Sequence, residues 1–413
     1  MRVSGVSTAA DGRPAVAEAN QEFDRKGTIT VAGAHFSHDL YSAFLGPLIP
    51  AVQEKLGVPL FVASLMVPAQ QVPSVFQPFI GAWADRTSKR WFVVLTPGIA
   101  AISVSMVGLA PHVALILLLL IASGLASAAF HAPSIALVGE YGGQQTGRAM
   151  SWFMAGGEAA RSLGPLVITA AISWFTLEGS FVVVVFGVAA SIILYFQIDT
   201  DASDQAAAAR RAEGVDIRAL LRLRIRWLVG LFGFALMVIF YTGPLNFLMV
   251  AYLLEQGHSE WFAGIALSIF FAAGGIGGLV GGSLSDRFGR RNVLLVNLIC
   301  TAPVMYFFLL TSSHAWFGLL TVILAGIFAM ANRPIQLALA QDILPESRAQ
   351  MSGLMLAFGF VSMSLITLGL GAAGDIVGLE SAMRVLPLFS ILAIPFVFLL
   401  PRRGDPLPML GDA

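Results

Sequence analysis

The chain has 413 residues, of which 57% are hydrophobic and 12% are charged, whereas a soluble domain carries about 25% charged residues. One apolar core stops growing near about 250 to 300 residues, so a water-soluble fold would expose much of this apolar surface. The 24 Lys and Arg balance 24 Asp and Glu without a long basic block, which excludes nucleic acid as a partner, and a single cysteine, Cys300, excludes a disulfide framework and a thiolate metal cluster.

Stretches without Asp, Glu, Lys or Arg predict where the chain crosses a membrane, because a spanning helix needs about 20 mostly apolar residues. Turn signals at 110–112 and 312–314 divide two long stretches into two spans each. In chain order, the twelve predicted spans lie near 28–52, 59–83, two within 91–139, 147–174, 179–198, 227–254, 261–285, two within 292–332, 349–374 and 385–400. We therefore expect an all-α integral membrane fold of twelve transmembrane helices.

The spans group into two sets of six around a long polar segment. The prediction is a disordered cytoplasmic tail at 1–26, an N-terminal six-helix half at 27–198, a cytoplasmic linker at 199–226, a C-terminal six-helix half at 227–401 and a cytoplasmic tail at 402–413. The first 26 residues have no apolar core of their own, so we expect a retained tail and not a cleaved signal peptide.

The positions of Lys and Arg predict the orientation in the membrane. With the N-terminus inside, the outer side holds only Lys55 and Arg384. Outside the linker, the cytoplasmic side then collects Arg25, Lys26, Arg86, Lys89, Arg90, Arg148, Arg287, Arg290, Arg291, Arg348, Arg402 and Arg403. We expect a multi-pass protein of the plasma (inner) membrane, a monomer in the lipid bilayer, with both termini in the cytoplasm.

An internal repeat relates the two halves at an offset of 201 residues. The segment at 81–90 returns at 282–291, and His131-Ala-Pro133 aligns with Asn332-Arg-Pro334. An offset of half the chain indicates two homologous six-helix halves, and repeated halves are typical of transporters.

The repeated segment has the pattern GxxxDRxxxR and resembles the signature loop of the major facilitator superfamily. Its residues are Gly81, Asp85, Arg86 and Arg90 in the first copy and Gly282, Asp286, Arg287 and Arg291 in the second. Glycine allows close helix contact, and the Asp can cap or pair with a neighbouring helix end. The resemblance covers the chain from Gly33 to the last span and implies a gating role. The alternative is a charge cluster that only sets topology.

Three further motifs resemble the fosmidomycin-resistance type of exporter within that superfamily. They are His35-Phe-Ser-His38-Asp39, Phe130-His131-Ala-Pro133, and the fifth span from Gly156-Gly157-Glu158 to Gly164-Pro165. The chain departs from that type at Ala132-Pro133-Ser134-Ile135, where a carboxylate and an arginine often follow. Gly164-Pro165 also resembles the antiporter motif of drug exporters, although Ala160 replaces the preceding glycine. These resemblances imply export.

His35, His38 and Asp39 lie at i, i+3 and i+4 and therefore on one face of the first span. Ionisable groups at this depth usually face a cavity or a partner. The face is interpreted as a proton relay or cavity lining, or as structural hydrogen bonding. A metal site is the alternative, since His and carboxylate suit zinc or iron. One helix would supply all its ligands unless His131 joined them, so we predict no metal.

Glu158 and Arg161, at i and i+3 in the fifth span, are expected to pair near the middle of the membrane. Arginine keeps its charge, which leaves Glu158 as the group that can exchange a proton; the alternative is an ion pair that only locks the helix. Arg333, one residue after the counterpart of His131, is expected to face Arg161 or to reach the interface. Tyr241 and Asn246, around Gly243-Pro244, complete the predicted binding residues.

No sequence pattern for catalysis is present: the chain has neither the GxxxxGK[ST] phosphate loop, nor HExxH, nor a nucleophile elbow. We therefore predict neither an enzyme nor a cofactor. The predicted function is a proton-coupled secondary transporter that exports a small organic solute or drug, with an anionic group favoured by the arginines. The alternatives are a proton symporter for uptake of a small organic anion and a non-transporting membrane receptor.

Overall fold

The computed structural model describes residues 22–84, 87–198, 222–344, 348–402 and 404–405. Every regular element within these ranges is a helix, so the predicted all-α class is confirmed. The predictions for Asp85, Arg86, Arg403, the linker at 199–221 and the tails at 1–21 and 406–413 lie outside the described residues.

Among its described residues, the N-terminal half contains nine α-helices and four short 3₁₀ helices. They are α1 (Arg25–Ser42), α2 (Leu45–Leu56), α3 (Leu60–Ser64), α4 (Met66–Gln71), η1 (Val72–Phe76), α5 (Gln77–Ala84), α6 (Lys89–Ser105), η2 (Met106–Leu109), α7 (Val113–Gly142), η3 (Gly143–Gln145), α8 (Thr146–Gly179), η4 (Ser180–Val183) and α9 (Val184–Gln197). The C-terminal half contains α12 (Ile225–Glu255), α13 (Glu260–Phe288), α14 (Arg290–Thr311), α15 (Ala315–Met330), α16 (Asn332–Ile343), α17 (Arg348–Val377), α18 (Leu379–Met383), α19 (Leu386–Leu392) and α20 (Ile394–Leu399).

Among the described residues, nine helical runs are long and apolar enough to cross a membrane. The first two predicted spans are absent from the nine because each is divided into shorter helices: α1 ends at Ser42, and Pro73 lies in η1. Proline lacks the N–H that a continuous helix needs. The fifth and sixth predicted spans form one run, 147–197, which is broken at Thr176, where φ is 64°. The number of twelve spans therefore stays a prediction.

The last residues of the predicted N-terminal tail are ordered. Asp24 caps α1 by accepting a hydrogen bond from the Gly27 N–H (2.9 Å), and the Asp24 N–H donates to the Tyr141 carbonyl (2.8 Å). The Phe23 ring packs against Trp152 at a centroid distance of 5.7 Å. Helix α1 consequently begins at Arg25, within the predicted tail.

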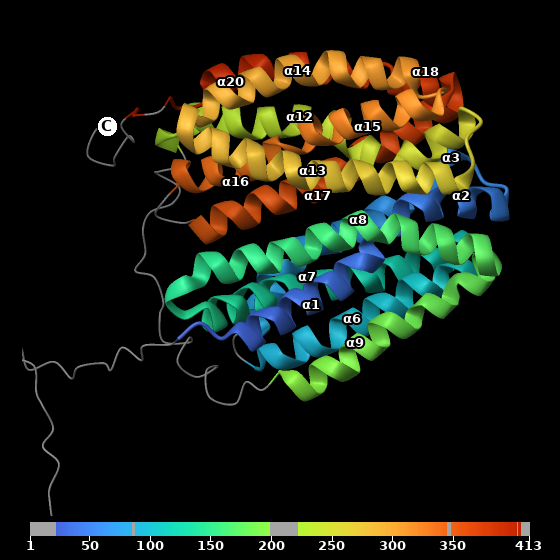
Figure 1. Ribbon diagram of the computed structural model, residues 1–413, viewed down its shortest axis with the longest axis horizontal. Coiled ribbons are helices and arrows are strands. Elements are labelled where there is room, and N and C mark those ends of the chain that lie inside the picture. The colour runs from blue at the N-terminus through green and yellow to red at the C-terminus, as the bar shows by residue number, and fades with distance from the viewer. Residues whose placement is uncertain (1–21, 85–86, 199–221, 345–347, 403, 406–413) are drawn as a thin grey trace, which may run out of the picture.

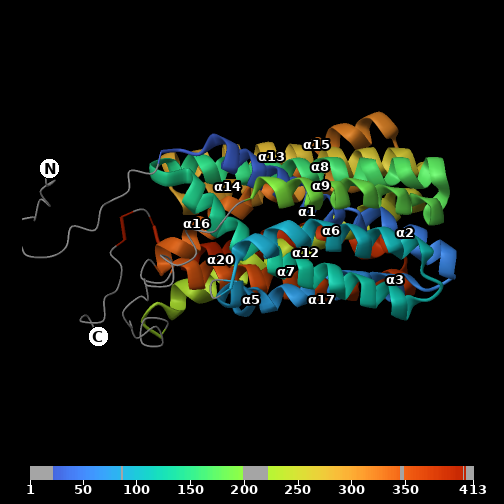
Figure 2. The same cartoon turned by 90° about the horizontal axis from the view of Figure 1, so that it is seen from below.

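The helices run side by side in two groups, α1–α9 and α12–α20 (Figure 1; the orthogonal view is Figure 2). The start of α1 meets the end of α9, where the Thr30 hydroxyl donates to Gln197 Oε1 (2.9 Å), and α12 starts at the same end of the molecule. We call this the linker end and the opposite end the far end.

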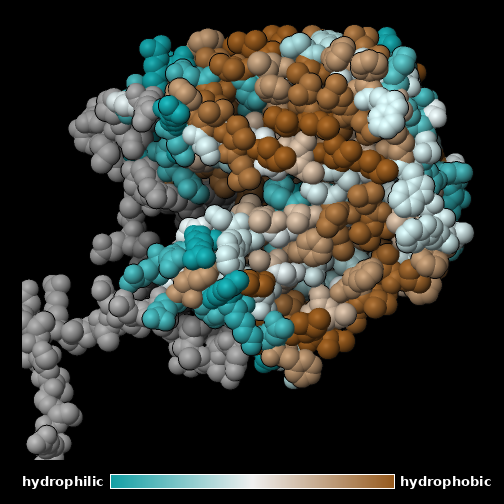
Figure 3. All heavy atoms as spheres, viewed as in Figure 1, coloured by the Kyte–Doolittle hydropathy of each residue, from teal (hydrophilic) through white to brown (hydrophobic). Residues whose placement is uncertain are grey.

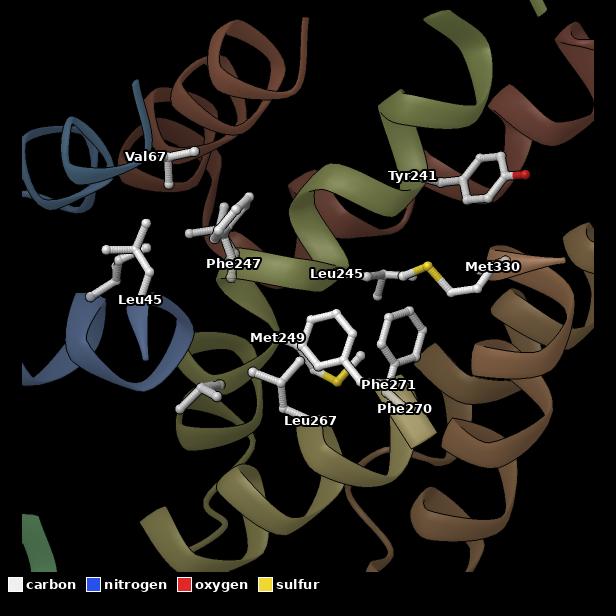
Figure 4. Close-up of a cluster of buried hydrophobic side chains, with 14 of the residues drawn as sticks. Leu45, Val67, Tyr241, Leu245, Phe247, Met249, Leu267, Phe270, Phe271 and Met330 are labelled. Carbon is white, nitrogen blue, oxygen red and sulfur yellow. The ribbon is translucent and has the colours of Figure 1, made fainter. Parts of the chain in front are cut away.

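Several contacts join the two groups at the far end. Asp375 of α17 accepts hydrogen bonds from the backbone N–H groups of Leu60 and Phe61, each at 2.8 Å, and so caps the start of α3. One buried cluster also spans both groups and includes Leu45 of α2 and Leu267 of α13 (Figure 4). Toward the linker end, the surface between the groups is hollowed and carries hydrophilic side chains (Figure 3).

Candidate functional site

The structure brings His131 of α7 against Asp39 of α1. His35 Nε2 lies 3.2 Å from Asp39 Oδ2, and His131 Nε2 lies 3.4 Å from Asp39 Oδ1. The side chains of His35 and Asp39 are 5% and 11% exposed, whereas that of His131 is 25% exposed. Two histidines from two helices therefore share one carboxylate, which the spacing within α1 alone does not predict.

Each of these histidines is oriented by a backbone carbonyl. His35 Nδ1 donates to the Phe153 carbonyl (2.8 Å), and His131 Nδ1 donates to the Ser127 carbonyl one turn earlier in α7 (2.9 Å). A carbonyl oxygen can only accept a hydrogen bond, so each Nδ1 carries the hydrogen. Each Nε2 then directs its lone pair toward Asp39 when the ring is neutral.

Close packing of α1 on α8 holds the His35 ring in place. The Phe153 ring stacks on it with centroids 4.0 Å apart. A Cβ atom at Gly157 would lie 2.5 Å from His35 Cε1, so only glycine fits at this position. The Gly156-Gly157-Glu158 motif thus has a local packing role at the site.

His38 has a different environment from His35 and Asp39. Its fully buried ring stacks on Phe130 at 4.5 Å, and both ring nitrogens lack a hydrogen-bond partner among the described residues. The ring meets His131 only edge to face, at 5.6 Å. The single face predicted for the three α1 residues is therefore divided between a carboxylate and an aromatic ring.

Glu158 and Arg161 of α8 form the predicted ion pair, between Arg161 Nη2 and Glu158 Oε1. Their side chains are 38% and 28% exposed although both lie in the middle of the helix. Glu158 faces the C-terminal half, since a Cβ atom at Gly275 of α13 would lie 4.0 Å from Glu158 Cβ. Arg161 is also within Coulombic range of Asp39. The pair therefore lies between the two groups of helices, beside the His35–Asp39–His131 cluster.

In the C-terminal half, Tyr241 is buried in a network of amides. Asn332 Nδ2 donates to the Tyr241 hydroxyl (3.1 Å), and Asn297 Nδ2 donates to Asn332 Oδ1 (2.9 Å). Sequence reasoning missed Asn297 and Asn332 as site residues. The repeat held a signal for the second, because Asn332 aligns with His131.

The two other predicted residues of this half differ in position. Asn246 is buried, and its Oδ1 has no hydrogen-bond partner among the described residues. Arg333 is half-buried and lies within Coulombic range of Arg161 and Glu158. Of the three predicted residues of this half, Arg333 is thus the one with an electrostatic interaction with the Glu158–Arg161 pair.

The comparison with known families agrees with this arrangement. The sequence matches the model of the Major Facilitator Superfamily over residues 31–265 and 245–409. The chain belongs to the Major Facilitator Superfamily. It is therefore a multi-pass membrane protein of a transporter family, and the resemblance of its signature loops to that superfamily is confirmed.

Relatives within the Major Facilitator Superfamily cover nearly the whole chain. The fosmidomycin resistance protein of Escherichia coli (strain K12) is 26% identical over 94% of this chain and 95% of its own length. The uncharacterized MFS-type transporter YfnC of Bacillus subtilis (strain 168) is 26% identical over 90% and 92%. The predicted resemblance to the fosmidomycin-resistance type is thus confirmed.

Solved structures of transporters share the fold. A bacterial homologue of the human lysosomal transporter Spinster, in an inward-facing and unoccupied conformation, superposes with a TM-score of 0.74 at 16% identity and covers 92% of this chain and 97% of that one. The D-xylose-proton symporter superposes with a TM-score of 0.71 at 14% identity and covers 94% and 99%.

The superfamily motif has a different environment in each half. A Cβ atom at Gly81 would come within 3.0 Å of Ala132 Cβ, whereas at Gly282 the nearest atom is 3.8 Å away, in Pro334. The expected role of glycine in close helix contact therefore holds in the first copy only. Asp286 and Arg287 are exposed in the last turn of α13.

The arginines that end the two motif copies contact aromatic rings. Arg90 lies over Tyr195 at 4.9 Å and donates to its carbonyl (2.7 Å), and Arg291 lies over Phe398 at 5.0 Å. Ion pairs stand beside them at the linker end: Lys89 with Glu140 (2.8 Å), and Arg290 with Asp342 (3.1 Å). The two pairs repeat the same contact between consecutive predicted spans in both halves.

Proposed function

We propose that the protein is a proton-coupled secondary transporter that exports a small organic anion by alternating access. The observation that carries this proposal is the Glu158–Arg161 ion pair, which is partly exposed between the two halves. A charged pair at membrane depth is costly unless it serves a ligand or a partner. Arg333 within Coulombic range supplies a second cation from the opposite half.

An anionic substrate would compete with Glu158 for the Arg161 guanidinium. The guanidinium fork suits carboxylates, phosphates and phosphonates, which it can bind with two parallel hydrogen bonds. Arrival of the anion removes the counter-charge from Glu158, which then takes up a proton more readily. Binding of substrate and movement of a proton are thereby linked through one arginine.

Export in exchange for protons further requires a group whose protonation weakens substrate binding. Asp39, His35 and His131 are the candidates for this group, because Asp39 is close enough to act electrostatically on Arg161. By charge alone a proton on this cluster would strengthen binding of an anion, so the competition has to come from a change in how Arg161 is held. The proposed proton path therefore includes Glu158 and the His35–Asp39–His131 cluster.

Alternating access requires that the far-end contacts break. Two contacts join the halves at that end. Asp375 caps α3, and the Trp261 indole N–H donates to Ser173 Oγ (2.8 Å). We propose that the described conformation opens at the linker end and that this end is cytoplasmic, in a monomer of the plasma membrane. The inward-facing conformation of the Spinster homologue supports this orientation.

Uptake of a small organic anion with protons is the second candidate, supported by the fold shared with the D-xylose-proton symporter. Export is favoured by the fosmidomycin resistance protein, which matches this chain over almost its full length. A non-transporting receptor has little use for a partly exposed Glu158–Arg161 pair. An imposed pH gradient separates export from uptake, because net flux of the substrate reverses between them.

The experiment uses the full chain in proteoliposomes, with fosmidomycin as the first compound in a panel of small carboxylates, phosphate esters and phosphonates. We expect Glu158→Gln to lose flux driven by a pH gradient while keeping counterflow, which moves no net proton. Glu380→Gln, in an exposed pair with Arg384 on α18, is the matched control and keeps both activities. Gradient-driven flux that survives in Glu158→Gln would show that the coupling runs elsewhere.

A further inference from the structure

We infer that His35 Nε2, the Asp39 carboxylate and His131 Nε2 form a binding site for a divalent transition-metal ion, with Zn²⁺ as the best fit. These three groups offer one ligand atom each, and the three atoms lie within 4.8 Å of one another. The inference stands on this geometry and does not depend on the proposed transport activity.

The spacing of the ligand atoms suits a four-coordinate ion. Bonds of about 2.0 to 2.1 Å in a tetrahedral zinc site place neighbouring ligand atoms about 3.3 Å apart. His35 Nε2 lies 3.2 Å from Asp39 Oδ2 and His131 Nε2 lies 3.4 Å from Asp39 Oδ1, so each histidine meets a different oxygen of the carboxylate, and the ligand atoms lie within 4.8 Å of one another. The two imidazoles only have to turn toward each other around the ion, because both already direct Nε2 at the same carboxylate.

Three hydrogen-bond acceptors converge at this point. Because His35 Nδ1 and His131 Nδ1 both donate to backbone carbonyls, each neutral ring presents an Nε2 lone pair to the Asp39 oxygens. Two lone pairs and a carboxylate repel one another unless a cation lies between them. A histidine that binds a metal usually donates its other ring N–H to a carbonyl or carboxylate, as both rings do here.

The surroundings would hold an ion firmly on the His35 side and leave it accessible to solvent on the His131 side. Phe153 stacks on His35, and Gly157 lets α8 approach this ring, so the buried ligand has little freedom to move. His131 is 25% exposed, which places the open coordination positions on its side. Arg161 repels a cation from this direction, but Glu158 is bonded to it and offsets its charge.

The ligand types select among metals. Imidazole nitrogen suits Zn²⁺, Cu²⁺, Ni²⁺ and Fe²⁺, whereas Mg²⁺ and Ca²⁺ prefer sites built from oxygen atoms alone. Three protein ligands with a remaining open position are the pattern of exchangeable zinc sites. We therefore expect Zn²⁺ to bind reversibly and Mg²⁺ not to compete.

The test is zinc binding by the full-length protein in detergent after treatment with a chelator, measured by calorimetry and by metal content after dialysis. We expect one Zn²⁺ per chain, and at least tenfold weaker binding in Asp39→Asn and in His131→Gln. Co²⁺ in place of Zn²⁺ should give the visible absorption of a four-coordinate site in the wild type and lose it in Asp39→Asn. Melting temperatures identify any variant that fails to fold.

His38→Gln is the matched control, because His38 lies on the same helix beside Asp39 but turns its ring onto Phe130. It should bind Zn²⁺ as the wild type does. Wild-type protein that binds no Zn²⁺, or equal loss in His38→Gln and Asp39→Asn, would overturn the inference and leave protons as the cations of this cluster. The assay measures binding and no flux, which separates this result from the fate of the transport proposal.

Discussion

Removing the Asp375 carboxylate should favour opening of the far end. Asp375 accepts two backbone hydrogen bonds at 2.8 Å from the start of α3 in the other half. Loss of a capping carboxylate costs about 0.5 to 2 kcal/mol, and the exposed position of Asp375 argues for about 1 kcal/mol per bond. Asp375→Ala would then destabilise the far-end contact by about 2 kcal/mol, or about 25-fold in the conformational equilibrium.

The assay measures how often the far end opens. Thr169 of α8 is 3% exposed, packs against Gly264 of α13 and makes no part of the cap, which joins α17 to α3. A cysteine introduced by Thr169→Cys, in a chain with Cys300→Ser, reacts with a maleimide only when the halves separate. Because the rate follows the open population, we expect about 25-fold faster labelling in Asp375→Ala.

The control for this experiment is Glu380→Ala, which removes an exposed carboxylate that pairs with Arg384 of its own half. Its labelling rate should equal that of the parent. If Asp375→Ala labels no faster than Glu380→Ala, the cap does not hold the halves together and the far-end contact has another basis.

Three further predictions follow from the site and the linker end. Arg161→Lys keeps the charge but loses the planar fork, so binding of an anionic substrate should weaken about tenfold or more in a thermal-shift titration; a cationic best substrate would contradict this. Gly157→Ala places a Cβ atom against the His35 ring, so it should cost about 1 to 3 kcal/mol of stability and lower the melting temperature. Exchanging Lys89 and Glu140 should restore the activity that Lys89→Glu alone loses, whereas equal loss in the exchanged variant would exclude a role for the pair itself.

The sequence predicts most of the helices because charge-free length is a local property. The structure differs from the predicted spans where prolines interrupt a helix and where the Thr176 backbone breaks the run 147–197. Hydropathy does not report φ angles, so the sequence pattern does not contain these breaks. The ordered start at Asp24 is likewise set by a cap and by a contact with α7, which a hydropathy pattern does not contain.

The site is predicted in part for a similar reason. The contact between Glu158 and Arg161 follows from their spacing in one helix. The contact between Asp39 and His131 joins helices far apart in the sequence, and no spacing rule fixes which histidine meets the carboxylate. His38 is an example, because its position in the sequence suggests a partner of Asp39, whereas in the structure its ring stacks on Phe130.

The contact between Asp39 and His131 has a counterpart in the second half, where Tyr241 meets Asn332 at nearly the same sequence offset. The first junction holds groups that can gain or lose a proton, whereas the second is a contact between a hydroxyl and an amide. A change of pH, or a cation bound as inferred above, would therefore alter the first junction and leave the second one unchanged. The two halves are thus nearly symmetric in fold but differ in how this junction responds to protons and cations.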